Sequence, residues 1–286
     1  MGLDGLEDWI TGHKLPVGDA MANLVDWIKL HSQTGFDALS DVIRFVVDGF
    51  TNTLASVPGP LLVLLLAIGA YALRRSIPVA VFVFAALLFI MNQGYWSETL
   101  ETLSLVLFAT LVSAAIGVPI GIAAAHRPWL AATLRPVLDL MQTLPTFVYL
   151  IPTLVLFGLG VVPGLISTVV FAMPAPIRLT QLGISAVPRP LIEAGQAFGA
   201  TPWQLLLKVE LPSARGAIMA GITQCIMLSL SMVVIAALVG AGGLGVPVVR
   251  ALNTVRIDLG FEAGFAIVLL AIVLDRVSRP AERRRG

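Results

Sequence analysis

The sequence predicts an all-α, polytopic membrane protein with about seven membrane-spanning helices. Hydrophobic residues make up 57% of its 286 residues and charged residues only 12%, whereas a soluble domain has about 25% charged residues. Most of the surface must therefore face hydrocarbon. A backbone in lipid has to satisfy its own hydrogen bonds, and the apolar runs lack the alternation expected of barrel strands. These runs are therefore predicted to be helices.

Seven apolar runs account for the predicted spans. A membrane helix needs roughly 20 mostly apolar residues, within a range of about 17 to 25. The two shortest runs reach this length only with an added turn at their ends. In chain order the seven runs are 56–73, 77–91, 103–125, 137–159, 161–177, 217–239 and 259–274.

The lysines and arginines predict the orientation of these spans. Cytoplasmic loops keep an excess of positive charge, and 13 of the 18 Lys and Arg residues fall on one side when the basic tail is placed inside. We therefore expect the N-terminus outside and the C-terminus in the cytoplasm. Its predicted parts are an extracytoplasmic or interfacial tail (1–55), a membrane domain (56–276) with a cytoplasmic loop (186–215), and a basic cytoplasmic tail (277–286).

Residues 37–57 form a further, weaker apolar pattern. Its apolar residues recur at helical spacing, with charged residues among them, and charges are costly at mid-membrane. This pattern predicts an amphipathic helix in the membrane interface. The alternative is an eighth span, which would move the N-terminus inside. The apolar residues are Val42, Phe45, Val46, Phe50 and Leu54, and the charged ones are Asp41, Arg44 and Asp48.

The cytoplasmic loop has the start and stop signals of two short helices joined by a tight turn. Pro190 suits the first turn of a helix over 191–198, and Gly199 can supply a left-handed C-terminal stop. Thr201-Pro-Trp-Gln204 has the pattern of a capping box, and Pro212 predicts that the second helix ends at about Glu210. Such a rigid element suggests a surface on which another protein docks; the alternative is a connecting loop.

A family resemblance favours docking. Glu193-Ala194-Gly195-x-x-x-Gly199, followed by Leu211-Pro212, resembles the EAA loop of ABC-importer permeases, with Gly195 and Val209 as the two departures. The resemblance implies a type I ABC-importer permease fold, in which this loop forms coupling helices that seat in the ATPase subunit. We call residues 186–215 the coupling segment. The residues expected to build its fold are Glu193, Ala194, Gly199 and Pro212, and Trp203 and Leu206 are candidates for the apolar contact with the ATPase.

A narrower resemblance extends over residues 94–245, which are similar to the glycine betaine, proline betaine and choline permeases. It implies uptake of a quaternary ammonium compound across the bacterial cytoplasmic (inner) membrane. The implied partners are two copies of an ABC ATPase, an extracytoplasmic substrate-binding protein and a second copy of this chain, with no cofactor and no nucleic acid. The alternatives are an ABC permease for another small solute, such as an amino acid, or an ion-coupled secondary transporter.

Four residues are candidates for the translocation pathway. Gln142 and Gln224 are the deepest large polar groups, although hydrogen bonding between helices would also explain them. Pro145 and Pro152 predict a broken helix, tolerable only where protein or a cavity satisfies the freed backbone. The ring of Tyr149 could face a passing cation; the alternative is a packed proline kink.

The glycines Gly240, Gly242 and Gly245 form a G-x-G-x-x-G pattern. A dinucleotide site needs a strand before such glycines, but an uncharged run long enough to cross a membrane precedes them here. We therefore expect a break where a span meets the outer surface, with the three glycines as a gate hinge.

Catalytic and metal-binding motifs are missing from the sequence. It has no phosphate-binding G-x-x-x-x-G-K-[ST] loop, no H-E-x-x-H and no G-x-S-x-G, so ATP hydrolysis must occur in a separate subunit. The single cysteine, Cys225, and three scattered histidines match no metal-ligand spacing. The chain is predicted to be a transport subunit, not an enzyme.

Overall fold

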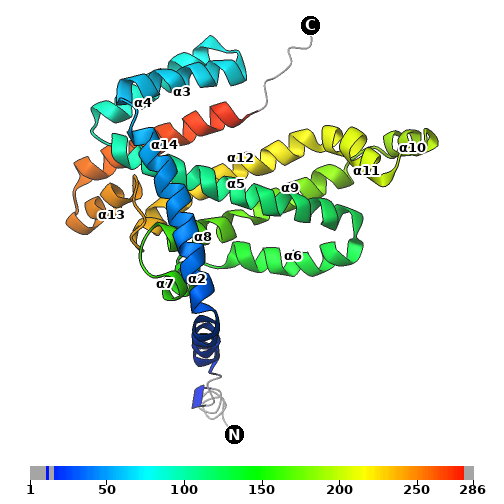
Figure 1. The fold of residues 1–286 in the computed structure, drawn as a ribbon, viewed down its shortest axis with the longest axis horizontal. Helices are drawn as coiled ribbons and strands as arrows, with labels where there is room; N and C mark the ends of the chain where they lie inside the picture. Colours follow the sequence, from blue (N-terminus) through cyan, green and yellow to red (C-terminus); the bar gives the residue numbers. More distant parts are fainter. Residues whose placement is uncertain (1–10, 13–15, 280–286) are drawn as a thin grey trace, which may run out of the picture.

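The computed structural model describes residues 11–12 and 16–279, and every regular element within them is a helix (Figure 1). The centre is formed by four helices that pack on one another. The four are α5 (Trp96–His126), α8 (Val161–Ala172), α9 (Pro174–Ser185) and α12 (Leu211–Ala237). Gly117 and Gly121 of α5 let α9 approach closely, since a Cβ on Gly121 would lie 2.6 Å from the Ile177 carbonyl oxygen of α9.

A second group of helices packs beside this centre. The α3–α4 pair contacts the last helix, α14, and all of them add buried apolar side chains to one core (Figure 1). The short α13 precedes α14 at one end of the molecule, and the coupling segment protrudes at the other. These helices are α3 (Gly59–Arg74), α4 (Ile77–Asn92), α13 (Gly245–Thr254) and α14 (Ile257–Ser278).

All seven predicted apolar runs are helical, but they differ in length. Four helical stretches are long and apolar enough to cross a membrane, and the number rises to six if each of two bent pairs counts as one span. α4 is a shorter apolar helix. The four stretches are Trp96–His126, Val161–Ser185, Pro202–Ala237 and Ile257–Ser278.

The prediction of one span over 137–159 is wrong in its shape. The chain forms α6 (Pro128–Thr143) and α7 (Thr146–Phe157), bent by 96°. The break comes at Pro145, as predicted, because the residue before a proline is driven into extended geometry; Leu144 has φ −63° and ψ 133°. Pro152 causes no break and lies inside α7.

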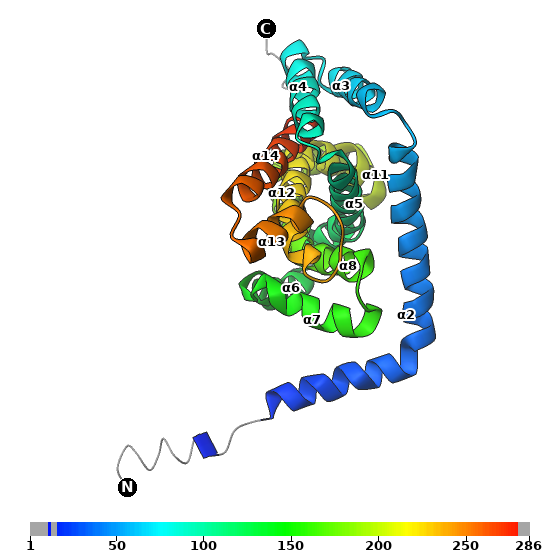
Figure 2. The same cartoon turned by 90° about the vertical axis from the view of Figure 1, so that its left-hand side faces the viewer.

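The N-terminal helix, α2 (Val17–Ala55), is much longer than the predicted 37–57 and is kinked at Ser32. It runs across the bundle helices rather than along them, and Figure 2 shows it on the outside of the bundle. It contacts α5, α7 and α8. Phe45 is 82% exposed on its outer side, whereas Val47 is buried against the bundle.

Candidate functional site

The first half of the coupling segment folds as its proline and glycine positions predict. α10 (Arg189–Ala197) has Pro190 in its first turn. Gly199 has a φ of +75°, a left-handed conformation that only glycine adopts without strain. The turn is closed by backbone hydrogen bonds from the amides of Gly199 to Gln196 (2.9 Å) and of Ala200 to Gly195 (3.1 Å).

The capping box at the start of α11 (Pro202–Leu205) is also confirmed. The Gln204 amide donates to Thr201 Oγ1 at 3.3 Å, and the Thr201 amide donates to Gln204 Oε1 at 2.9 Å. The glycine at 195 also has a structural reason, since a Cβ there would lie 2.7 Å from Leu205 Cδ1. α10 therefore folds back closely onto α11.

The predicted end of the second helix at Glu210 is wrong. A π-helical turn, η1 (Leu206–Glu210), leads directly into α12, and the Leu211 amide donates to the Leu206 carbonyl five residues earlier. A proline inside a helix clashes with the carbonyl four residues before it, and the wider π-turn lets the chain pass Pro212 without ending the helix. The coupling segment is therefore continuous with a membrane span over Pro202–Ala237.

The tip of the coupling segment, around the glycine turn, is apolar and exposed. Trp203 is 71% exposed, as a docking residue should be, but Leu206 is only half-exposed. Phe198 is 93% exposed and Leu207 is 58% exposed; sequence reasoning missed both. The position of Phe198, directly before the glycine turn, was the available signal. Glu193 and Ala194 are exposed on α10.

Gly240 and Gly242 lie in a closely packed loop, and Gly245 begins α13 directly after it. We call residues 238–245 the outer glycine loop, after the orientation that the sequence predicts. Gly240 has a φ of +84°. At Gly242 a side chain would overlap the Glu101 carboxylate, and at Gly245 it would overlap the Val233 carbonyl. The loop also carries Gly243, which was not predicted and has a φ of +99°.

A neighbouring helix and a turn hold this loop. On α5, Thr102 Oγ1 accepts a buried hydrogen bond of 2.8 Å from the Leu244 amide, and the Glu101 carboxylate lies against the loop at Gly242. On the other side, the Gly160 amide donates to the Val239 carbonyl at 2.8 Å. Neither Glu101 nor Thr102 was predicted, because no local pattern shows which residues of a distant helix face a loop.

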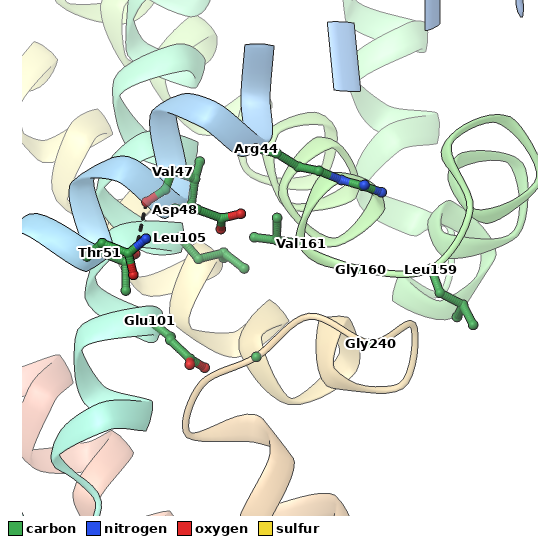
Figure 3. A pocket seen from close by; sticks show the side chains of 12 residues that line it. Arg44, Val47, Asp48, Thr51, Glu101, Leu105, Leu159, Gly160, Val161 and Gly240 are labelled. Atoms are coloured by element: carbon green, nitrogen blue, oxygen red, sulfur yellow. Dashed lines mark hydrogen bonds between the residues drawn. The ribbon is translucent and has the colours of Figure 1, made fainter. Parts of the chain in front are cut away.

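A cavity of about 600 Å³ lies between α2, α5 and the outer glycine loop (Figure 3). Two of the charged residues of the predicted interfacial helix line it: Figure 3 shows Arg44 and Asp48 beside the cavity, with Glu101 below them. Thr51 Oγ1 donates to Ser104 Oγ at 2.7 Å and ties α2 to α5. Two charged residues of α2, Arg44 and Asp48, thus line a cavity, whereas Asp41 does not line it and the apolar Val42 and Phe45 are exposed.

Three of the four predicted pathway residues lie at one turn. Gln142 and Pro145 are exposed at the α6–α7 break, and the Tyr149 hydroxyl donates across it to the Met141 carbonyl. The Tyr149 ring stacks edge-on with Phe171, with centroids 6.1 Å apart. Gln224 lies apart from these residues, exposed on α12. Within the described part of the chain, neither glutamine side chain hydrogen-bonds another helix.

Comparison with known proteins agrees with this geometry. Residues 117–285 match the family model for the binding-protein-dependent transport system inner membrane component. The chain is 45% identical over 266 residues to the glycine betaine transport system permease protein OpuAB of Bacillus subtilis, covering 93% of this chain and 94% of that protein. It is 42% identical over 269 residues to the glycine betaine/proline betaine permease ProW of Escherichia coli, covering 94% of this chain and 76% of that protein.

A solved structure shares the fold. An inward-facing structure of the MetNI methionine ABC transporter superposes with a TM-score of 0.57 at 25% identity, covering 62% of this chain and 89% of that one. The expected all-α, type I importer architecture is confirmed. The chain belongs to the binding-protein-dependent transport system inner membrane components, the non-catalytic permease subunits of ABC importers.

Proposed function

We propose that this permease imports quaternary ammonium compounds, with glycine betaine, proline betaine and choline as the candidate solutes. The observation that carries the proposal is the 45% identity to a glycine betaine permease over nearly the whole chain. A glycine betaine/carnitine permease, GbuB of Listeria monocytogenes, is also 42% identical over 94% of this chain. The named solutes of these relatives share a quaternary ammonium group.

In this proposal the coupling segment receives motion from the ATPase. Its exposed apolar side chains, Phe198 and Trp203, suit a contact that excludes water, and α11 continues without a joint into a membrane span. A groove in the ATPase that moves on ATP binding would therefore move that span as a lever. ATP binding would open the pathway outward to receive solute, and hydrolysis would reset it.

The assembly in this proposal contains two copies of the chain. Each chain has one coupling segment, so two chains would engage two ATPase subunits. The extracytoplasmic binding protein would supply solute, and its site would set most of the selectivity. The α6–α7 break, with Gln142, Pro145 and Tyr149, and Gln224 on α12 are proposed to line the pathway, and the outer glycine loop, with Gly240, Gly242 and Gly245, to act as its outer hinge.

We further propose that residues 1–55 are outside and that α2 lies in the outer interface. α2 crosses the bundle nearer the α13 end than the coupling segment (Figure 1). It exposes apolar side chains such as Val42 and Phe45, as a lipid contact requires. The basic tail would then lie in the cytoplasm; residues 1–10, 13–15 and 280–286 are outside the described residues. Labelling of a cysteine placed at exposed Asp19 by a membrane-impermeant reagent on intact cells is expected; protection until lysis would contradict this orientation.

The proposal is tested by uptake of labelled glycine betaine and choline, measured side by side. Cells that lack their own uptake would express the chain with its ATPase and binding protein. Saturable uptake that disappears when the ATPase is omitted is the expected result. If neither solute enters while all subunits are present in the membrane, the solute class is wrong and an amino acid becomes the next candidate.

A further inference from the structure

Helix α5 is held at both of its ends by groups that belong to the two functional regions. It is 31 residues long, or about 45 Å at 1.5 Å per residue. Glu101 and Thr102, near its first turn, bind the outer glycine loop. His126, its last residue, contacts Glu210 at the base of the coupling segment.

The contact at the cytoplasmic end is a buried one. His126 Nε2 lies 2.9 Å from Glu210 Oε2, and Glu210 is only 5% exposed although it lies on the π-turn beside exposed coupling residues. Glu210 Oε2 accepts no well-aligned hydrogen bond from any described residue. The contact is therefore an ionic one in the imidazolium form of His126, and losing it would leave the buried carboxylate without that cationic partner.

The geometry of the imidazole favours this pairing. His126 Nδ1 lies 2.9 Å from the Ile122 carbonyl oxygen one turn earlier, which fixes the ring so that Nε2 is turned toward Glu210. The imidazolium form carries an N–H on each nitrogen, and each nitrogen of His126 lies 2.9 Å from an oxygen atom, of Ile122 or of Glu210. The ring therefore joins the end of α5 to the π-turn in one defined orientation.

Between its ends α5 is continuous and closely packed. Pro119 lies within it without ending the helix, and Gly117 and Gly121 bring this part of α5 directly against α9. Thirteen of its residues are buried, so it cannot bend freely. A displacement applied at His126 would be carried to Glu101 by a packed helix.

We propose that α5 is a strut that transmits movement of the coupling segment to the outer glycine loop, with His126 and Glu210 as its positioning residues at one end and Glu101 and Thr102 at the other. The inference rests on the proposed coupling role of residues 186–215. It differs from that role in naming α5 as a second route, besides α12, between the ATPase side and the outer loop.

The test uses a cysteine reporter on the outer glycine loop. Ala241 is 1% exposed, and the chain's own cysteine, Cys225, is buried, so Ala241→Cys in a Cys225→Ala background gives one site whose maleimide labelling reports opening of the loop. The permease–ATPase complex would be held in nanodiscs, which expose both faces. Labelling would be compared with no nucleotide and with a non-hydrolysable ATP analogue.

The nucleotide is expected to raise the labelling rate about fivefold or more in the reporter protein, the lower bound of a typical allosteric coupling. His126→Gln and Glu210→Gln should each abolish the response, and His126→Arg, which keeps a cation beside Glu210, should restore most of it. Arg127→Gln removes the next, exposed cation and is the matched control, expected to respond normally. Glu101→Gln should label quickly with or without nucleotide.

The outcomes separate the strut from the coupling role on which it rests. A reporter protein that shows no nucleotide response contradicts the proposed coupling itself. A normal response in the reporter protein that persists in both His126→Gln and Glu210→Gln overturns the strut alone. Because His126 has a side chain that is 46% exposed, its replacement by glutamine or arginine should leave the fold intact.

Discussion

The coupling segment and the outer glycine loop both interrupt the apolar chain with glycines, but for different physical reasons. Gly199 supplies a left-handed turn with open space around it. Gly242 is needed because the Glu101 carboxylate, 141 positions away on α5, occupies the space of a side chain. Gly199 is required by the local backbone conformation, whereas Gly242 is required by contact with a residue far along the chain.

This difference separates an exposed element from an embedded one. The coupling segment has its own caps and turn and exposes apolar side chains. The outer glycine loop also has local backbone hydrogen bonds, but it is held in addition by α5 and by the turn at Gly160. Substitutions in the first region should therefore act through its local geometry, whereas those in the second should depend on which residue stands opposite.

The largest expected effect is on Gly199. Valine at a φ of +75° is strained by roughly 1 to 3 kcal/mol or more, so Gly199→Val should abolish uptake while membrane insertion is retained. Gly216→Val is the matched control, because Gly216 lies in the α12 helix with nothing within 4 Å of its Cβ position. Normal uptake by Gly199→Val at normal expression would show that the docking geometry is wrong.

The next largest effect is expected for Gly242→Ala, which tests whether the distant residue Glu101 is the reason for this glycine. The added methyl group overlaps the Glu101 carboxylate, so thermal stability of the purified protein and uptake should both fall. A second substitution, Glu101→Ala, makes room and should restore stability in the double variant relative to Gly242→Ala alone. If Glu101→Ala gives no such recovery, the overlap with Glu101 does not explain the glycine.

A smaller loss of uptake is expected when the capping box is disrupted. Thr201→Ala removes the oxygen that accepts from the Gln204 amide, at a cost of about 1 kcal/mol. Uptake should fall only partly, and Thr201→Ser, which keeps the oxygen, should remain near wild type. Equal activities of the alanine and serine variants would argue that the cap has no functional role.

The smallest effect is expected for the ion pair between Arg178 and Asp139, which joins α9 to α6 at 2.6 Å. Both side chains are more than a third exposed, and such pairs contribute about 0 to 1 kcal/mol. Asp139→Asn should leave uptake and thermal stability nearly unchanged. A large loss would mean that this pair is covered by a partner in the assembled transporter.

Features with local causes were predictable from the sequence, and those with distant causes were not. The Gly199 turn, the Thr201 capping box and the break at Pro145 each depend on neighbouring residues, and each prediction is confirmed. The end of the helix at Pro212 was wrong because a π-turn absorbs the proline. Glu101 and His126 were missed because their partners lie far along the chain.

The most direct test of the central claim is whether the apolar end of the coupling segment holds the ATPase. Phe198 and Trp203 would be replaced together by glutamate, and the ATPase that co-purifies with the tagged permease would be measured. Leu252→Glu on α13, at the opposite end and 78% exposed, is the control for a charge on an apolar surface. We expect the ATPase to be lost from the double variant and retained by the control; retention by both would contradict docking through this segment.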